Sequence, residues 1–406
     1  MHYQTIQSLS VKIRNGEVSP VDVVDASLTR IASLNPGLNA FITVLSDEAR
    51  ASAGIAEEEI RTGKWRGPLH GIPVGVKDFY DTKGVRTTGG SAAMKDRVAD
   101  RDAAAVTKLE AAGAVIIGKT NMDALGMATT GLTSHFGPVR NPWNVAYVSG
   151  GSSAGSAVAV ASGMCYATLD TDAVGSVRLP AACCGVVGFK GSYGLISTRG
   201  ILGDEPVDDF IRWMAHAGVT TRDAGDTALV LDALATHPET GFAQAVTDAR
   251  PLRIGVGQNV HAGAAVAKAF NAAVEVVARF GYPVSDAAVP LGDPSQGSFA
   301  RIERDRRDIG EEAFSEVDVI LLPTTLETTP TVRTAEQDPE QAVSAEITAF
   351  ANYFGLPAAS VPCGFDSLGM PIGLQIVARP GADASVLAVA AAYQGAAGLT
   401  PRHPPV

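Results

Sequence analysis

One lysine and two serines in glycine-rich segments are the residues of this chain best suited to do chemistry. Ser152 lies in the run GGSSAGS at 150–156, Ser176 lies in TDAVGSVRLP at 171–180, and Lys77 lies upstream in HGIPVGVKD at 70–78. A serine hydroxyl is a weak nucleophile until a base accepts its proton, and a neutral lysine amine can be that base. These residues therefore indicate a serine hydrolase that uses no catalytic histidine.

The segment around Ser152 also has the local sequence of a site. Its glycines allow positive φ angles and a close approach of the backbone to a ligand. The following run SAVAVA at 156–161 predicts a buried helix of small residues, and the amides at a helix start favour negative charge. A flexible glycine–serine linker is the alternative, but a linker would not run directly into an apolar helix.

Two other patterns that could carry chemistry are weaker. The run GAVIIGKT at 113–120 matches a phosphate-binding loop, but its middle residues form the best strand in the neighbourhood and therefore cannot curl around an anion. Seven histidines are present, and His70 and His135 lie in no nucleophile-elbow context, so they are interpreted as structural or surface residues. No cluster has the spacing of a zinc or calcium site.

The composition excludes several classes of partner. The 406 residues include 32 basic and 43 acidic side chains, a net charge of −11, which argues against binding nucleic acid or an anionic membrane. The mixed run at 301–308 predicts an exposed helix face. The polar amino terminus lacks the apolar stretch of a signal peptide, and no apolar run reaches the ~18 residues of a membrane span. Four unpaired cysteines fit inert thiols, and a cytoplasmic location is expected.

The periodicity along the chain predicts an α/β fold. The first 60 residues should be helical, with a helix that Ser19 caps, that begins at Pro20 and that ends at 35–37. Further helices are expected over 103–112 and 264–280. Strands are expected at 114–117, 252–256, near 283–284, and at 317–322, 358–361 and 372–377. This alternation favours one α/β domain over 1–406, with a mostly parallel or mixed sheet covered on both faces.

Four blocks in order along the chain resemble the amidase signature family. They are the Lys77 segment, GKTNMD at 118–123, the region 150–190, and GLPA at 355–358 through GLQ at 373–375. The resemblance implies a signature core at about 65–200 and a large mixed sheet sandwiched between helical layers. It also implies hydrolysis of a carboxylic amide without a metal ion or organic cofactor.

The resemblance assigns roles to individual residues. Ser176 is the expected nucleophile, Ser152 the bridging serine after a cis peptide bond, and Lys77 the base. The backbone amides of Ala173, Val174, Gly175 and Ser176 are the expected oxyanion hole. Met127 is the expected substrate-lining residue. Arg178 would either reach a substrate carboxylate or tie down the nucleophile loop.

The chain departs from the family pattern in the nucleophile loop. Family members usually read GTDTGGS or a close variant, whereas 170–176 reads DTDAVGS. Asp170 and Val174 therefore replace small residues. Because a β-branched side chain resists positive φ, either the backbone at 174 suits valine or the oxyanion hole is distorted. The region 238–301 is shorter than in the longer members, which suggests a small amide or an open cleft.

We therefore expect a cytoplasmic amidohydrolase of a small-molecule amide, with no nucleic-acid or membrane partner and with a homodimer left open. Two alternatives remain at this point. One is the catalytic A-type subunit of a glutamine-dependent aminoacyl-tRNA amidotransferase, which the run FGPVRNPW at 136–143 would suit. The other is a catalytically impaired family member that acts in binding.

Overall fold

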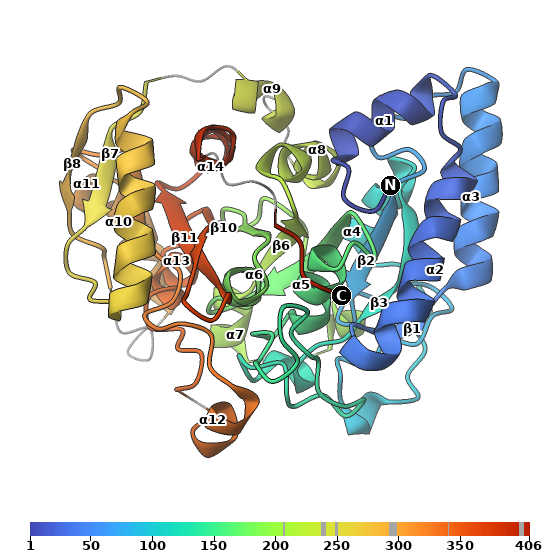
Figure 1. Cartoon of the computed structure of the whole chain (residues 1–406), viewed down its shortest axis with the longest axis horizontal. Helices are drawn as coiled ribbons and strands as arrows, with labels where there is room; N and C mark the ends of the chain where they lie inside the picture. Colours follow the sequence, from blue (N-terminus) through green and yellow to red (C-terminus); the bar gives the residue numbers. More distant parts are fainter. Residues whose placement is uncertain (206–207, 237–240, 248–250, 292–298, 340, 398–401) are drawn as a thin grey trace.

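Eleven strands form one mixed sheet through the centre of the molecule (Figure 1). The computed structural model describes residues 1–205, 208–236, 241–247, 251–291, 299–339, 341–397 and 402–406. The strands are β1 Phe41–Val44, β2 Pro73–Lys77, β3 Val115–Thr120, β4 Ala167–Asp172, β5 Val187–Lys190, β6 His216–Thr221, β7 Ile254–Gly257, β8 Val284–Ala287, β9 Val319–Pro323, β10 Ala358–Phe365 and β11 Pro371–Ala378. Their order across the sheet is β1-β3-β2-β4-β6-β5-β10-β11-β9-β7-β8.

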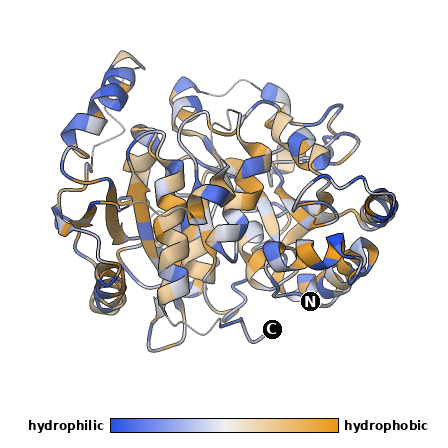
Figure 2. Cartoon of the chain, turned by 90° about the horizontal axis from the view of Figure 1, so that it is seen from above, coloured by the Kyte–Doolittle hydropathy of each residue, from blue (hydrophilic) through white to orange (hydrophobic). Residues whose placement is uncertain are grey.

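Helices cover both faces of this sheet. The α-helices are α1 Ile6–Arg14, α2 Pro20–Leu38, α3 Ser46–Arg61, α4 Ala104–Ala111, α5 Ala154–Ala161, α6 Arg178–Cys184, α7 Asp209–Met214, α8 Ala224–Leu234, α9 Phe242–Thr247, α10 Ala264–Ala278, α11 Phe299–Glu312, α12 Val332–Gln337, α13 Ala349–Tyr353 and α14 Asp383–Ala396. Helices α4, α8, α10 and α14 pack in one layer, and α2, α5 and α6 pack in the other. Hydrophobic segments gather between these layers, and hydrophilic ones lie outside (Figure 2). The expected α/β sandwich is confirmed.

The sheet is parallel where it holds the candidate catalytic residues. Strands β3, β2 and β4 run parallel to one another, and β6, β5, β10 and β11 continue antiparallel. The carboxyl ends of β2 and β4 therefore meet at one edge of the sheet. Lys77 is the last residue of β2, and Asp172 is the last residue of β4.

Most of the predicted elements are present. Helix α4 and strand β3 form the predicted unit at 103–117, and Gly113 between them has φ 83°. Because Lys119 lies within β3, the phosphate-loop pattern at 113–120 is an extended strand, as predicted. Strands β7 to β11 and helix α10 lie where the sequence places them. Part of the short region at 238–301 falls outside the described residues.

Two predictions for the amino-terminal segment are wrong. Strand β1 interrupts the first 60 residues, and α2 continues to Leu38 instead of ending at 35–37. Pro36 fits inside the last turn, and Asn39 ends the helix with φ 55°, a left-handed conformation that asparagine tolerates. The Asn35 side chain exchanges two hydrogen bonds with the backbone of Phe41, which leads the chain directly into β1.

Candidate active site

Lys77 and Ser152 are in direct contact in the interior. The Lys77 Nζ atom lies 2.8 Å from the Ser152 Oγ atom, 2.9 Å from the Thr171 Oγ1 atom and 3.3 Å from the Thr171 carbonyl oxygen. Lys77 is fully buried and Ser152 is 1% exposed. The structure therefore brings together two of the three predicted catalytic side chains and adds Thr171 as a third partner of the amine.

The surroundings of Lys77 favour the neutral amine that a base requires. Burial lowers the pKa of Lys77 to about 8, although the carboxylates of Asp170, Asp172 and Asp123 act in the opposite direction. Removing an ammonium group from water disfavours its charged form. A lysine with this pKa is available to accept a proton near neutral to mildly basic pH, whereas an exposed lysine, with a pKa of about 10.4, is not.

Asp123 links the Ser152 loop to the neighbouring loop that contains Gly131 and Thr133. The peptide bond between Gly151 and Ser152 is cis. The amide of Asp123 donates to the Ser152 carbonyl oxygen at 3.1 Å, and its carboxylate accepts from the amides of Gly131 and Thr133. Only glycine fits at 151, because an added Cβ would lie 2.0 Å from the Asp123 carboxylate. Helix α5 starts two residues after Ser152 and is buried along its length, as predicted.

Ser176 follows β4 and lies against the Ser152 loop. The Ser153 amide donates to the Ser176 carbonyl oxygen at 3.0 Å, which joins the two serine loops. Ser176 is 4% exposed, and in the described part of the chain its hydroxyl makes no hydrogen bond. Catalytic hydrogen bonds are often loose before substrate binds. The nucleophile assigned by the family resemblance is thus next to the Lys77–Ser152 pair.

The loop before Ser176 presents unused backbone donors. None of the amides of residues 173–176 donates a hydrogen bond to another described residue. Val174 does not have a positive φ, so its branched side chain is compatible with the backbone there. Gly175 takes the unusual conformation instead, with φ 139°, and Thr348 donates its hydroxyl to the Val174 carbonyl oxygen. Valine at 174 therefore does not distort the loop.

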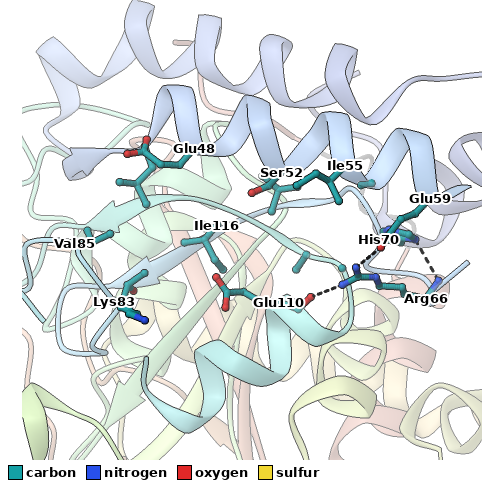
Figure 3. Close-up of a pocket in the computed structure, with 16 residues that line it drawn as sticks. Glu48, Ser52, Ile55, Glu59, Arg66, His70, Lys83, Val85, Glu110 and Ile116 are labelled. Carbon is teal, nitrogen blue, oxygen red and sulfur yellow. Dashed lines mark hydrogen bonds and ion pairs between the residues drawn. The ribbon is translucent and has the colours of Figure 1, made fainter. Parts of the chain in front are cut away.

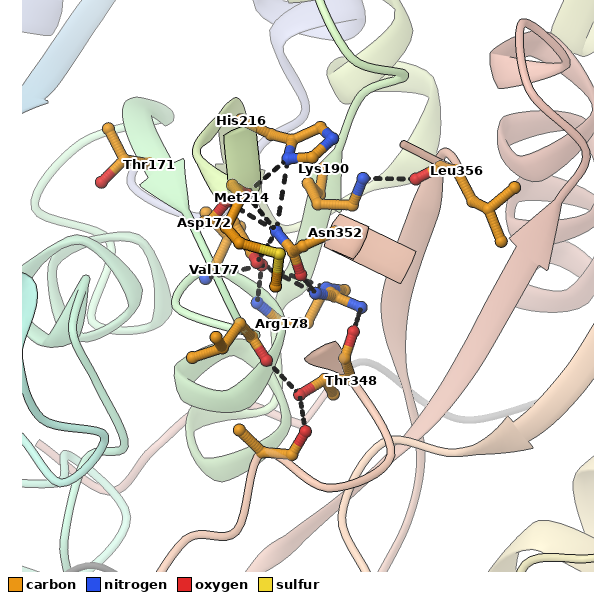
Figure 4. Close-up of polar contacts among 12 residues, drawn as sticks. Thr171, Asp172, Val177, Arg178, Lys190, Met214, His216, Thr348, Asn352 and Leu356 are labelled. Carbon is orange, nitrogen blue, oxygen red and sulfur yellow. Dashed lines mark hydrogen bonds and ion pairs between the residues drawn. The ribbon is translucent and has the colours of Figure 1, made fainter. Parts of the chain in front are cut away.

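Arg178 is a structural arginine in this site (Figure 4). Its guanidinium group is fully buried and binds the Asp172 carboxylate through Nε at 3.0 Å and Nη2 at 2.9 Å. Its remaining donors contact Thr348, Asn352 and Gln375. Burial alone would raise the pKa of Asp172, but Arg178 holds it well below its ordinary value. Every donor of the Arg178 guanidinium group already has a protein partner. This supports the interpretation that Arg178 ties down the nucleophile loop.

Met127 lies at the surface beside the site. It is 75% exposed and follows a tight turn in which Leu125 has φ 51° and Gly126 has φ 72°. A Cβ added at Gly126 would lie 3.5 Å from the Ser152 Oγ atom and 3.0 Å from the Phe79 ring. The turn that ends at Met127 is therefore next to the Ser152 hydroxyl.

Sequence reasoning misses the residues that hold the site from a distance. Thr348 and Asn352 are about 170 positions after Ser176 in the chain, yet Asn352 donates to the Asp172 carbonyl oxygen at 2.7 Å. Gln375 is visible in the sequence only as part of a family block. Thr171 lies inside the nucleophile segment, but nothing in the sequence indicates that its hydroxyl faces Lys77.

A separate cavity of about 370 Å³ lies between α3, α4 and β3 and contains none of the three predicted catalytic residues (Figure 3). His70 lines it and is structural, as predicted: its Nε2 atom is 3.2 Å from the Glu59 carboxylate, and its Nδ1 atom accepts from the Arg66 amide. In the described ranges no three metal-ligating side chains cluster. No described helix combines the length and apolar character needed to cross a membrane.

Comparisons with known proteins agree with this fold. The family profile described as Amidase matches residues 22–296 and 294–387. The A-type subunit of the glutamyl-tRNA(Gln) amidotransferase of Geobacter metallireducens is 32% identical, with 97% of each chain covered. Its counterpart in Anaeromyxobacter dehalogenans is 34% identical, with 95% of each covered. Among solved structures, a 6-aminohexanoate cyclic dimer hydrolase bound to its substrate superposes with a TM-score of 0.86 at 28% identity, covering 100% of this chain and 99% of the other.

The peptide amidase of Stenotrophomonas maltophilia is a further structural relative, with a TM-score of 0.84 at 25% identity, covering 100% of this chain and 98% of the other. Sheet, helical layers and sequence thus define an α/β amidase fold. The chain belongs to the amidase signature family, whose members include these carbon–nitrogen hydrolases.

Proposed function

We propose that this protein hydrolyses a small carboxylic amide to an acid and ammonia or an amine, through an acyl-enzyme on Ser176. The contact of the Lys77 Nζ atom with the Ser152 Oγ atom at 2.8 Å carries this proposal. A buried lysine amine with a lowered pKa that contacts a serine hydroxyl can take up the proton of that hydroxyl.

The first half of the reaction forms the acyl-enzyme. The Ser176 Oγ atom attacks the amide carbonyl carbon, and its proton passes to Ser152 while Ser152 gives its own proton to Lys77. The free amides of 173–176 would bind the negative oxygen that develops on the former carbonyl. When the tetrahedral intermediate collapses, the carbon–nitrogen bond breaks, and the same relay returns the proton to the leaving nitrogen.

The second half releases the product acid. Water takes the position of the departed amine and gives its proton to the relay as it attacks the acyl carbon. Collapse of this second intermediate breaks the bond to Ser176, and the proton returns to the Ser176 oxygen. Lys77 ends the cycle as the neutral amine with which it started. No atom changes oxidation state in either half, because each half only exchanges one acyl bond for another.

A fluorophosphonate probe tests this function without knowledge of the substrate. It should label wild-type protein at Ser176, as located by peptide mass mapping, and should not label Ser176→Ala. Folded wild-type protein that stays unlabelled would favour the alternative of an impaired family member acting in binding. A screen of small aliphatic, aromatic and ureido amides then identifies the acyl group.

The A-type amidotransferase subunit is the second candidate, because relatives with that name match almost the whole chain at 32% and 34% identity. Such a protein releases ammonia from glutamine for a partner. Co-purification of further subunits from the native source, together with glutamine hydrolysis, would select this candidate. Amide hydrolysis by the isolated chain with no glutamine hydrolysis would reject it.

A further inference from the structure

A buried aspartate lies in β4 immediately before the residue that binds the Lys77 amine. Asp170 is fully buried, and its Oδ2 atom accepts hydrogen bonds from the hydroxyls of Thr168 at 2.6 Å and Thr220 at 2.8 Å. Its Oδ1 atom has no hydrogen-bond partner among the described residues. A buried carboxylate oxygen without a donor is costly, so its position calls for an explanation.

The register of the sheet places Asp170 beside Lys77. Strands β2 and β4 are parallel neighbours in which Gly75 pairs with Thr168 and Val76 with Leu169. Continuing this register by one residue sets Lys77 next to Asp170. A Cβ at Gly75 would lie 3.0 Å from the Thr168 methyl group, so these two positions share a face. Side chains two residues apart on a strand point to the same face of the sheet, so Lys77 and Asp170 lie on the same face as Gly75 and Thr168.

The other groups near Asp170 are neutral or act as hydrogen-bond donors. The Tyr80 hydroxyl donates to the Asp170 carbonyl oxygen at 2.8 Å, and burial raises the pKa of Tyr80 well above its ordinary value. Burial also raises the pKa of Cys165 to about 12. Burial raises the pKa of Asp170 itself, while the hydroxyls of Ser156, Thr168 and Thr220 and the charge of Lys77 oppose that rise. Lys77 is thus the cation that acts on this carboxylate.

Lys77 in turn faces three carboxylates. Asp123 lies on the loop after β3, and Asp170 and Asp172 lie on β4. Asp172 is already neutralised by Arg178, and Asp123 is held by the amides of Gly131 and Thr133. Of the three, Asp170 is therefore the carboxylate whose described donors are hydroxyls, so neither a guanidinium group nor backbone amides offset its charge.

We propose that Asp170 is a positioning residue for Lys77, a buried negative charge that delays the loss of the lysine proton as the pH rises and so sets the pH range of catalysis. This rests on the proposed role of Lys77 as the base. It also explains how the chain accommodates a charged residue where the family motif has glycine: by the strand register the carboxylate lies beside Lys77, and hydroxyls of β4 and β6 bind it.

The test is a direct titration of Lys77 in wild-type protein and in Asp170→Asn. Protein labelled with ¹³C at lysine Cε gives an NMR signal for Lys77, assigned by its loss in Lys77→Met. The wild-type midpoint is expected near pH 8. Two unit charges on neighbouring strands interact strongly enough that Asp170→Asn should lower the midpoint by about 1–2 pH units. The pH at which fluorophosphonate labelling of Ser176 is half-maximal should fall equally.

Two further variants keep the result unambiguous. Asp170→Gly, which restores the residue of the family motif, should lower the midpoint as Asp170→Asn does and replaces it if the asparagine variant does not fold. Asp226→Asn removes another buried carboxylate, one that accepts from the amides of Ile6 and Gln7, and should leave the Lys77 midpoint unchanged.

An unchanged Lys77 midpoint in folded Asp170→Asn and Asp170→Gly would overturn the proposal for Asp170. Failure of the hydrolase proposal looks different: wild-type protein would not label at any pH. In that case the NMR titration, which needs no activity, would still decide whether Asp170 controls the Lys77 proton.

Discussion

Replacing Lys77 with methionine should strongly reduce catalysis without destabilising the fold at neutral pH. Methionine fills a similar volume but cannot accept a proton, so the Ser152 hydroxyl loses the partner that lies 2.8 Å away. General-base catalysis contributes about 10²–10⁴-fold to a rate. The second-order rate of Ser176 labelling should therefore fall by about 10³-fold, equivalent to about 4 kcal/mol of transition-state stabilisation.

The effect on stability follows from the burial of the lysine. The pKa of Lys77 falls from 10.5 to about 8, so the folded state binds fewer protons than the unfolded state between these two values. Stability contributed by this group therefore rises with pH across that window, by about 3 kcal/mol in total. Below about pH 8 the wild type carries the full penalty. Because Lys77→Met lacks this penalty, it should be at least as stable as wild type at pH 7.

Urea unfolding at pH 7, 8, 9 and 10 measures this difference. As the pH rises, the free energy of unfolding of wild type should increase relative to that of Lys77→Met. Most of this increase should occur above pH 8. Lys190→Met is a matched control: this lysine is also buried, with its pKa lowered well below the ordinary value, and donates to the carbonyl oxygens of Leu356 and Gly191. It should retain Ser176 labelling. A pH-independent difference, or full labelling of Lys77→Met, would refute this reasoning.

Three further changes test the nucleophile loop and its support. Gly175→Ala should lower the labelling rate by about 10²–10³-fold, because at φ 139° the new methyl group would lie 2.5 Å from the Thr348 hydroxyl and displace the oxyanion donors. Val174→Gly should leave that rate unchanged, since valine is unstrained there; a large gain would show that valine does distort the loop. Arg178→Lys should cost about 3–5 kcal/mol in urea unfolding, because lysine cannot bind the Asp172 carboxylate through two nitrogens. A raised KM with unchanged stability would instead indicate that Arg178 binds substrate.

The sequence alone determines the class of fold and the chemistry to look for. Alternating apolar runs and helical periods are local properties, so β3, α4 and α10 are placed correctly from their own residues. The glycine-rich motifs are equally local. They point to Ser152 and Ser176 as candidate site residues, and the family resemblance adds Lys77 as the predicted base. Where a side chain acts across a turn, as Asn35 does on Phe41, local reasoning ends the helix too early.

The tertiary structure decides how these residues meet. Thr171 and Asp170 lie far from Lys77 in the sequence. Only the parallel pairing of β2 with β4 brings Lys77 to these two residues. Thr348 and Asn352, from the carboxyl-terminal part of the chain, complete the support of the nucleophile loop. Burial sets the pKa of Lys77, and burial belongs to the assembled core rather than to any segment. Residue types thus predict the class of reaction, whereas strand order and desolvation determine whether the lysine can act as a base.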